Sequence, residues 1–179
     1  MNLTASKVMW GKTLNSGQVC IAPDYVFVHE KRLKEFVEAC QGKLTSFFGE
    51  ENKKLSPYQG RIVNKFHTER LKKAIDTCQG QIICGGKVDV EKQHVQPTLV
   101  LEPKKDSILM TEEIFGCVLP IFPYSSINEV IEFINSKDKP LTVYYFGSYG
   151  NPNMDRVREQ TSSGHLMQNE MLYQFCTNY

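Results

Sequence analysis

The sequence has 179 residues, of which 21 are Lys or Arg and 20 are Asp or Glu, so its net charge is +1. This balance gives no overall attraction to nucleic acid or to anionic membranes, and no apolar run reaches the roughly 20 residues of a membrane-spanning helix. Hydrophobic residues make up 41% of the chain, which is typical of a globular protein with a buried core. We therefore expect a soluble chain that does not bind nucleic acid.

The six cysteines are scattered along the chain, and no two have the CxxC spacing of zinc or iron–sulfur sites. No metal site is therefore predicted. The first residues lack the basic start and apolar centre of a signal peptide. We expect reduced thiols in an intracellular, cytoplasmic protein.

Helix and strand patterns alternate in the first half of the chain. Apolar side chains recur at three- and four-residue steps from Leu33 to Phe47, which predicts an amphipathic helix that ends at Gly49. Turn-forming residues at 15–17 end an earlier helix. The predicted elements are a helix over 3–14, a strand over 25–29, a helix over 30–48, a polar loop that contains Ser56 and Pro57, and a helix over 64–78.

The second half is richer in strands, and the strand at 142–146 has the composition of a buried one. The predicted strands are 81–84, 97–102, 118–124, 142–146 and 164–168, and the predicted helices are 127–135 and 151–161. Strands that alternate with helices favour an α/β fold with a mostly parallel sheet flanked by helices. Since no repeat or linker interrupts the chain, residues 1–179 are predicted to form one α/β domain.

This pattern places Cys20 in a loop between a helix and a strand, at the rim of the predicted sheet. Active sites gather at such rims, and backbone amides in tight turns can donate hydrogen bonds to an anion. A thiol there acts as a nucleophile if its pKa is lowered or a base lies near it. From spacing alone, however, a lone loop cysteine is more often a small apolar residue without a chemical role.

The segment 15–25, which reads Asn-Ser-Gly-Gln-Val-Cys-Ile-Ala-Pro-Asp-Tyr, resembles the active-site segment of aldehyde dehydrogenases. In that family, Asn-x-Gly-Gln-x-Cys contains the nucleophilic thiol. The continuation after the cysteine looks like the class 3 branch, which acts on medium- and long-chain aliphatic aldehydes and on aromatic aldehydes. The resemblance implies that Cys20 is the catalytic nucleophile, with Asn15, Gly17 and Gln18 in the neighbourhood of the substrate and its oxyanion.

A second segment, 112–120, reads Glu-Glu-Ile-Phe-Gly-Cys-Val-Leu-Pro and is similar to the family's Glu-Glu-Ile-Phe-Gly-Pro-Val. The resemblance implies that Glu113 accepts hydrogen bonds from the nicotinamide ribose and that Phe115 packs beside the nicotinamide ring. A carboxylate suits a diol, and a rigid aromatic side chain orients a ring. The residues alone also allow an acid pair at a helix end beside a core phenylalanine. Because Cys117 replaces the family's proline, we expect a less rigid loop around Glu113.

Weaker likenesses follow in the same order along the whole chain. Thr-Ser-Ser-Gly at 161–164, followed by Asn169, resembles the family's glycine-rich strand with its asparagine. His165 stands where class 3 enzymes usually have a second glycine, and we expect its imidazole to narrow the site. The four histidines are widely spaced and have no metal-ligand spacing, so we expect them to be surface or hydrogen-bonded residues.

The resemblance also implies partners for the site. It implies NAD or NADP as the cofactor, an aldehyde as the substrate, and homodimers in the parent family. The cofactor-binding Rossmann half, the general-base glutamate and an oxyanion-binding asparagine are expected upstream of Met1. Residues 1–179 are therefore predicted to be a partial catalytic domain, inactive alone, with no separate cofactor-binding domain. A membrane anchor in the C-terminal tail of a longer form is compatible with the class 3 likeness.

Two other functions stay open from the sequence. One is a non-catalytic remnant that binds a partner through its exposed face. The other is a cofactor-free thiol esterase that works through Cys20 alone. Retained reactivity of the Cys20 thiol would favour an enzyme, whereas an inert but folded chain would favour the interaction module.

Overall fold

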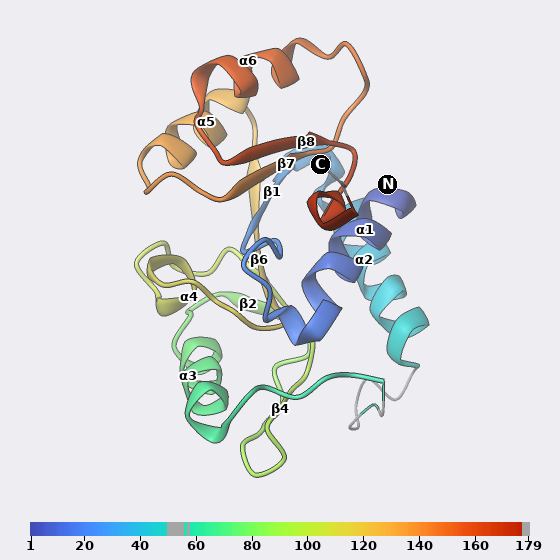
Figure 1. Ribbon diagram of the computed structural model, residues 1–179, viewed down its shortest axis with the longest axis vertical. Coiled ribbons are helices and arrows are strands. Elements are labelled where there is room, and N and C mark those ends of the chain that lie inside the picture. The colour runs from blue at the N-terminus through green and yellow to red at the C-terminus, as the bar shows by residue number, and fades with distance from the viewer. Residues whose placement is uncertain (50–55, 57, 177–179) are drawn as a thin grey trace.

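Three parallel strands run through the middle of the molecule, and helices cover them on both faces (Figure 1). The computed structural model describes residues 1–49, 56 and 58–176. The helices are α1 (Asn2–Thr13), α2 (Leu33–Phe48), α3 (Lys65–Asp76), α4 (Ile108–Thr111), α5 (Ile127–Asn135) and α6 (Pro152–Gln160), with 3-10 turns at Leu14–Gly17, Glu30–Arg32 and Tyr173–Cys176. The strands are β1 (Val26–His29), β2 (Gln81–Cys84), β3 (Val88–Asp89), β4 (His94–Val95), β5 (Thr98–Leu101), β6 (Val118–Tyr124), β7 (Thr142–Tyr145) and β8 (His165–Gln168).

The main sheet has the strand order β1-β6-β5-β2. The strands β1, β6 and β5 are parallel, and β2 is antiparallel to β5. The strands β3 and β4 form a small antiparallel pair, whereas β7 and β8 form a separate parallel pair. The predicted α/β fold with a mostly parallel sheet flanked by helices is therefore confirmed.

The central strand β6 separates two layers of apolar packing. Leu119 and Ile121 are fully buried on one face against α1 and α2. Val118 is fully buried on the other face, where it packs with Leu71 of α3. The side chains of β6 alternate between the faces because successive residues of a strand point in opposite directions.

Local sequence signals set the ends of the helices. Ser126 and Glu129 form a capping box at the start of α5, and Asn151 caps α6 in front of a proline at the first turn. Gly49 follows α2 with a positive φ of 78°. These positions agree with the predicted helix boundaries because caps and turns depend on nearby residues.

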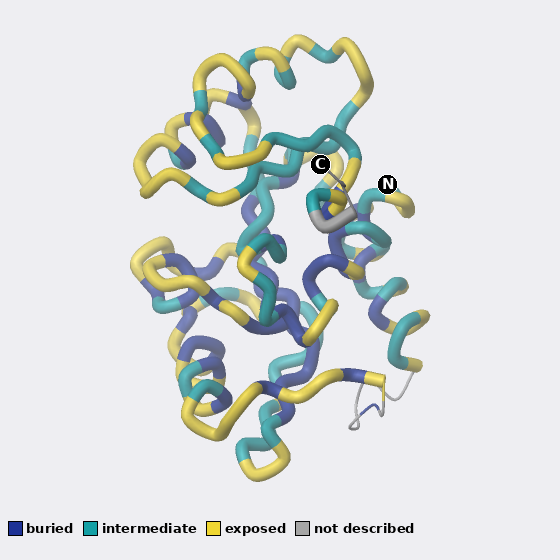
Figure 2. The backbone as a smooth tube through the Cα atoms, viewed as in Figure 1, coloured by how far each residue is buried: buried dark blue, intermediate teal, exposed yellow. Residues whose placement is uncertain are grey.

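The prediction that 142–146 is a buried strand was wrong. All four residues of β7 are only half-buried, and Figure 2 shows β7 and β8 in teal beside the dark blue centre of the main sheet. The reason is that β7 has a single strand neighbour, β8, among the described residues. The pair β3–β4 and the short helix α4 were not predicted, and most of the polar loop, including Pro57, lies outside the described residues.

Within the part of the chain that the structure describes, no helix has both the length and the apolar character required to cross a membrane.

Candidate active site

Three successive residues after α1 adopt left-handed backbone conformations. The φ angles are 49° at Asn15, 56° at Ser16 and 79° at Gly17. Glycine reaches this region without cost, whereas a residue with a side chain loses on the order of 1–2 kcal/mol. The sequence predicted a turn here, but it gave no signal that Ser16 would share the left-handed conformation. The surrounding contacts must hold this turn in place.

Side-chain hydrogen bonds fasten the turn to the segment before α3. Ser16 Oγ donates to Gly60 O at 2.7 Å. Gln18 Nε2 donates to Arg61 O at 3.0 Å, and Gln18 Oε1 accepts from Val63 N at 2.9 Å. Both the nitrogen and the oxygen of the Gln18 side-chain amide therefore hold the turn against this segment.

The turn presents Cys20 to solvent. The Cys20 side chain is exposed and lines a cavity of about 1100 Å³. Ala22 N donates to Val19 O at 2.9 Å, which closes a tight turn around the cysteine. Among the described residues, none accepts a hydrogen bond from the Cys20 backbone N–H. This donor is therefore free to bind an anion that forms beside the thiol.

The loop between α4 and β6 lines the same cavity through Glu113 and Phe115. Phe115 has a positive φ of 46° and is 42% exposed, so it is not a core residue. Two donor groups of Arg70, on α3, hold the loop from outside. Its Nη1 donates to Glu113 O at 3.2 Å, and its Nη2 donates to Ile114 O at 2.5 Å.

The two loops meet directly, although about ninety residues separate them in the chain. Asp24 Oδ1 accepts a hydrogen bond from Ile114 N at 3.1 Å. A Cβ atom built on Gly17 would lie 2.3 Å from Gly116 O, so the backbones pack where no side chain fits. The structure therefore brings Cys20, Glu113 and Phe115 to one cavity.

Lys12 adds a buried amino group to this cavity. Its side chain lies on the inner face of α1, and only 1% of the residue is exposed. Burial lowers the pKa of the Lys12 ammonium, while the negative charges of Asp24 and Glu113 oppose this effect. The sequence analysis missed Lys12. Its position three and four residues after the apolar Met9 and Val8 was the available signal, because such residues share a helix face.

Cys117 is anchored in the core next to the loop. Its Sγ donates to Val95 O at 3.0 Å and accepts from Gln59 Nε2 at 3.6 Å. Burial raises the pKa of the Cys117 thiol to about 12, so the group stays protonated. Cys117 stands where the family has proline. Its side-chain hydrogen bonds restrain the loop, whereas a proline ring would restrain it by fixing the backbone angle φ.

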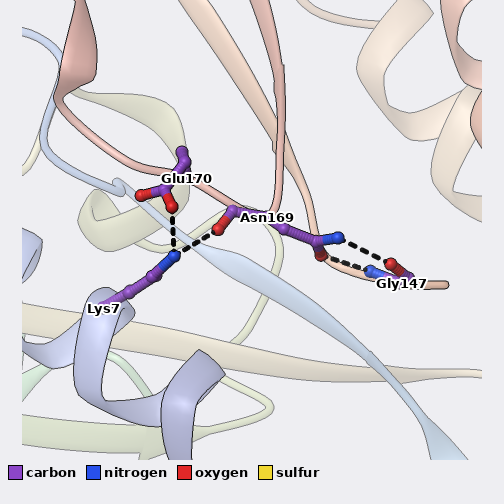
Figure 3. A network of polar contacts seen from close by, with 4 residues as sticks. All are labelled: Lys7, Gly147, Asn169 and Glu170. Carbon is purple, nitrogen blue, oxygen red and sulfur yellow. Dashed lines mark hydrogen bonds and ion pairs between the residues drawn. The ribbon is translucent and has the colours of Figure 1, made fainter. Parts of the chain in front are cut away.

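Asn169 and His165 have different relations to the cavity. Asn169 lines it, and its side-chain amide pairs with Gly147, with Nδ2 donating to Gly147 O at 2.8 Å and Gly147 N donating to Oδ1 at 2.9 Å. Lys7 of α1 donates to Asn169 O at 2.7 Å and forms an ion pair with Glu170 (Figure 3). The side chain of Asn169 thus joins the ends of β7 and β8. His165 is exposed and does not line the cavity, so the structure does not place it where it would narrow the site.

The family model described as the aldehyde dehydrogenase family matches residues 1–177. The chain belongs to the aldehyde dehydrogenase family. A similar relative is aldehyde dehydrogenase family 3 comG of Dictyostelium discoideum, with 39% identity over 98% of this chain. Another is aldehyde dehydrogenase family 3 member A2 of Rattus norvegicus, with 36% identity over 99% of this chain. These relatives support the class 3 resemblance.

The chain is also similar in structure to solved aldehyde dehydrogenases. The substrate-bound state of Staphylococcus aureus AldH superposes with a TM-score of 0.91 and 35% identity, and the match covers 98% of this chain. However, the match covers only 38% of the Staphylococcus aureus chain. Likewise, these 179 residues span 36% of the length of the Dictyostelium relative. The 179 residues thus correspond to little more than a third of these proteins.

Proposed function

We propose that this region belongs to an enzyme that oxidises aldehydes to carboxylic acids with NAD or NADP, and that Cys20 is its nucleophile. The observation that supports this most is the meeting of two loops. The exposed thiol of Cys20 lies in the same cavity as Glu113 and Phe115. A hydrogen bond and a glycine contact fix the two loops against each other.

In this proposal, the Cys20 thiolate attacks the aldehyde carbonyl carbon and forms a thiohemiacetal. The carbonyl oxygen becomes an oxyanion that accepts a hydrogen bond from the Cys20 backbone N–H, an interaction that in comparable enzymes is worth about 2.7–4 kcal/mol. Loss of hydride from the former carbonyl carbon gives a thioester on Cys20. Water then releases the carboxylic acid and restores the thiol.

The residues present fit a nicotinamide cofactor. Glu113 offers an exposed carboxylate that can accept hydrogen bonds from the two ribose hydroxyls, and the exposed ring of Phe115 offers a wall for the nicotinamide. The bound cofactor supplies the hydride acceptor. Arg70 and Asp24 hold the segment that carries both side chains.

Asn15 and Gln18 have a positioning role in this proposal. Asn15 Nδ2 donates to Gln18 O at 3.1 Å, and Gln18 N donates back to Asn15 O at 3.2 Å. These contacts orient the backbone that leads to Cys20. Gly17 allows the close approach of the cofactor loop.

We also propose that these 179 residues alone carry out acylation of Cys20 but no turnover. They span 36% of the Dictyostelium relative, and the resemblance assigns the general base and most of the cofactor site to the upstream part. Without a hydride acceptor, an aldehyde cannot be oxidised. An activated ester needs no oxidation to acylate the thiol, so it tests the nucleophile separately.

The test is the intact mass of the chain after brief exposure to p-nitrophenyl acetate, beside Cys20→Ser and Cys84→Ser. We expect one acetyl group, lost only in Cys20→Ser, because Cys40, Cys78 and Cys117 are buried. An activated thiol should react at least about tenfold faster in the folded chain than in the unfolded chain. Acetylation spread over several cysteines, or equal rates in both states, would contradict the proposed role of Cys20.

A further inference from the structure

A lysine side chain reaches the cavity beside Cys20 from the inner face of α1. Lys12 lines this cavity together with Cys20, although only 1% of the residue is exposed. The buried residues Val8 and Met9 precede it by four and three positions, so all three share one helix face. The helix therefore brings a primary amine to the wall of the cavity, at a position where its neighbours are apolar.

The amino group of Lys12 has no hydrogen-bond or ion-pair partner in the part of the chain that the structure describes. Lys7 on the same helix differs, since its Nζ donates to Asn169 O at 2.7 Å and pairs with Glu170 (Figure 3). Lys12 Nζ is nevertheless not one of the unpartnered polar atoms that the described residues enclose completely. The nitrogen therefore keeps contact with the cavity.

Three ionisable groups act on this amine, from the two loops that meet beside Cys20. Asp24 and Glu113 favour its charged form, but neither forms an ion pair with it. Glu113 is exposed, so water screens its charge. Cys117 contributes little because burial raises the pKa of its thiol to about 12 and keeps it protonated. Burial of Lys12 itself is the largest effect, and it lowers the pKa of the ammonium.

A buried amine without a partner is suited to act as a nucleophile. A charged ammonium group is costly to hold away from water, so burial favours the neutral form, which carries the reactive lone pair. At about pH 6.5, a lysine with the ordinary pKa of about 10.4 is neutral in only about 1 of 10,000 molecules. Each unit by which the pKa falls raises this fraction about tenfold.

We propose that Lys12 forms an imine with aldehydes that enter the cavity, as a second reactive group beside Cys20. Lys12 Nζ attacks the carbonyl carbon, the nitrogen loses one proton and the oxygen gains one, which gives a carbinolamine. The hydroxyl group then leaves as water with the second proton of the nitrogen, and a C=N double bond forms. This inference rests on the proposed function for the choice of an aldehyde, but it does not require the thiol.

The experiment traps the imine by reduction. The full chain is incubated at about pH 6.5 with benzaldehyde and sodium cyanoborohydride, which converts an imine into a stable benzylamine, and peptide mass spectrometry locates the modified lysines. Lys34 on α2 is the internal reference because its side chain is 90% exposed. We expect Lys12 to be benzylated at least about tenfold faster than Lys34, as a pKa lower by one unit or more implies.

The pH dependence gives a second readout on the same two lysines. Between about pH 6.5 and pH 9, the neutral fraction of an exposed lysine rises roughly 300-fold. The neutral fraction of Lys12 should rise less, because burial lowers its pKa. The preference for Lys12 over Lys34 should therefore shrink at the higher pH.

Lys12→Met and Lys34→Met form a matched pair, since both replace an amine with an unbranched apolar side chain. Lys12→Met should lose the fast adduct, whereas Lys34→Met should keep it. Methionine suits a buried helix face, and locating the adduct on the original chain needs neither variant. Cys20→Ser should also keep the fast adduct, because the nitrogen attacks the aldehyde directly.

Three results would overturn the proposal. One is benzylation of Lys12 no faster than that of Lys34 at about pH 6.5. Another is an equal preference for Lys12 in the urea-unfolded chain, which would assign it to the neighbouring sequence and not to the cavity. The third is loss of the adduct in Cys20→Ser, which would show that the aldehyde reacts only through the thiol.

Failure of this proposal is distinguishable from failure of the proposed function. Acylation of Cys20 by p-nitrophenyl acetate is measured without an aldehyde, and imine trapping is repeated without the Cys20 thiol. Hydroxylamine removes an acetyl group from a thioester but not from an amide, so acetyl transfer to Lys12 is told apart from acylation of Cys20.

Discussion

At the level of single residues, two physical constraints require glycine at position 17. Its φ of 79° lies where side chains are disfavoured, and a Cβ atom would lie 2.3 Å from Gly116 O. The neighbour is backbone, which cannot move aside as a flexible side chain can. The loop that carries Cys20 and the loop that carries Glu113 and Phe115 therefore approach each other only because residue 17 is glycine.

We predict that Gly17→Ala destabilises the fold by about 1–3 kcal/mol, since the left-handed conformation and the contact with Gly116 both oppose it. Acylation of Cys20 by p-nitrophenyl acetate should slow as well, because the turn must shift. Denaturant unfolding and intact mass are the measurements.

The control is Gly42→Ala, the same chemical change in the middle of α2. No atom lies within 4 Å of a Cβ built on Gly42, so this variant should gain about 0.4–1 kcal/mol. Destabilisation of equal size in both variants would show that the contact between Gly17 and Gly116 has no special role.

At the level of elements, α3 supports the loop of Glu113 and Phe115 through one side chain. Arg70 donates to the carbonyl oxygens of Glu113 and Ile114. A guanidinium group presents parallel donors that a lysine cannot reproduce. The helix thus holds the backbone between Glu113 and Phe115, which Asp24 also contacts.

We predict that Arg70→Ala frees this loop. The amide of Ile114, which donates to Asp24 Oδ1, should exchange roughly 5–30-fold faster, as expected for the loss of about 1–2 kcal/mol of hydrogen bonding. Lys72→Ala, which removes an ion pair with Asp76 on the same helix, should leave the exchange of Ile114 unchanged. If both variants act alike, a general loosening of α3 explains the effect.

The elements predicted from the sequence were those with strong local signals. The boundaries 127–135 of α5 were predicted as the structure has them, because a capping box and an apolar stripe define them. The pair β3–β4 was missed because each strand has two residues, too few for a periodic pattern. The strand β8 ends at Gln168, where Asn169 takes a positive φ of 61° and pairs with Gly147.

At the level of the whole molecule, a buried polar network joins the segment before α3 to the strand β4. His94 Nε2 donates to Gln59 Oε1 at 2.8 Å, and Gln59 Nε2 donates to Val95 O at 2.6 Å. Burial lowers the pKa of His94, and the nearby positive charge of Arg61 acts in the same direction. The histidine is thus a hydrogen-bonded core residue, as the sequence analysis expected for histidines without metal-ligand spacing.

This pKa shift predicts a pH dependence of stability. The unfolded chain binds a proton at a histidine pKa of about 6.5, whereas folded His94 binds it only at lower pH. The unfolded state therefore takes up more protons as pH falls through this range, and the free energy of unfolding should decrease. Between about pH 7.5 and 5.5, where carboxylates titrate little, His94→Gln should flatten this decrease in urea unfolding experiments.

His67→Gln, on the partly exposed surface of α3, is the matched control. It should keep the pH dependence of the original chain. A steep loss of stability that persists in His94→Gln would assign the effect to other groups.

The sequence by itself determined the family and most of the elements. The spacing of Asn15, Gly17, Gln18 and Cys20 and the Glu-Glu-Ile-Phe-Gly segment are local patterns, and so are helix periodicity and caps. Such signals act over a few residues, so they can be read without knowing what packs against them.

Only the tertiary structure decided what these patterns contact. It brought Asp24 to Ile114 across ninety residues, buried Lys12 beside the cavity, and left β7 half-buried at an open edge. Burial and long-range hydrogen bonds depend on which elements lie next to each other, and that arrangement is a property of the whole packed chain. The composition of β7 is that of a buried strand, whereas among the described residues only β8 pairs with it and its side chains are half-buried.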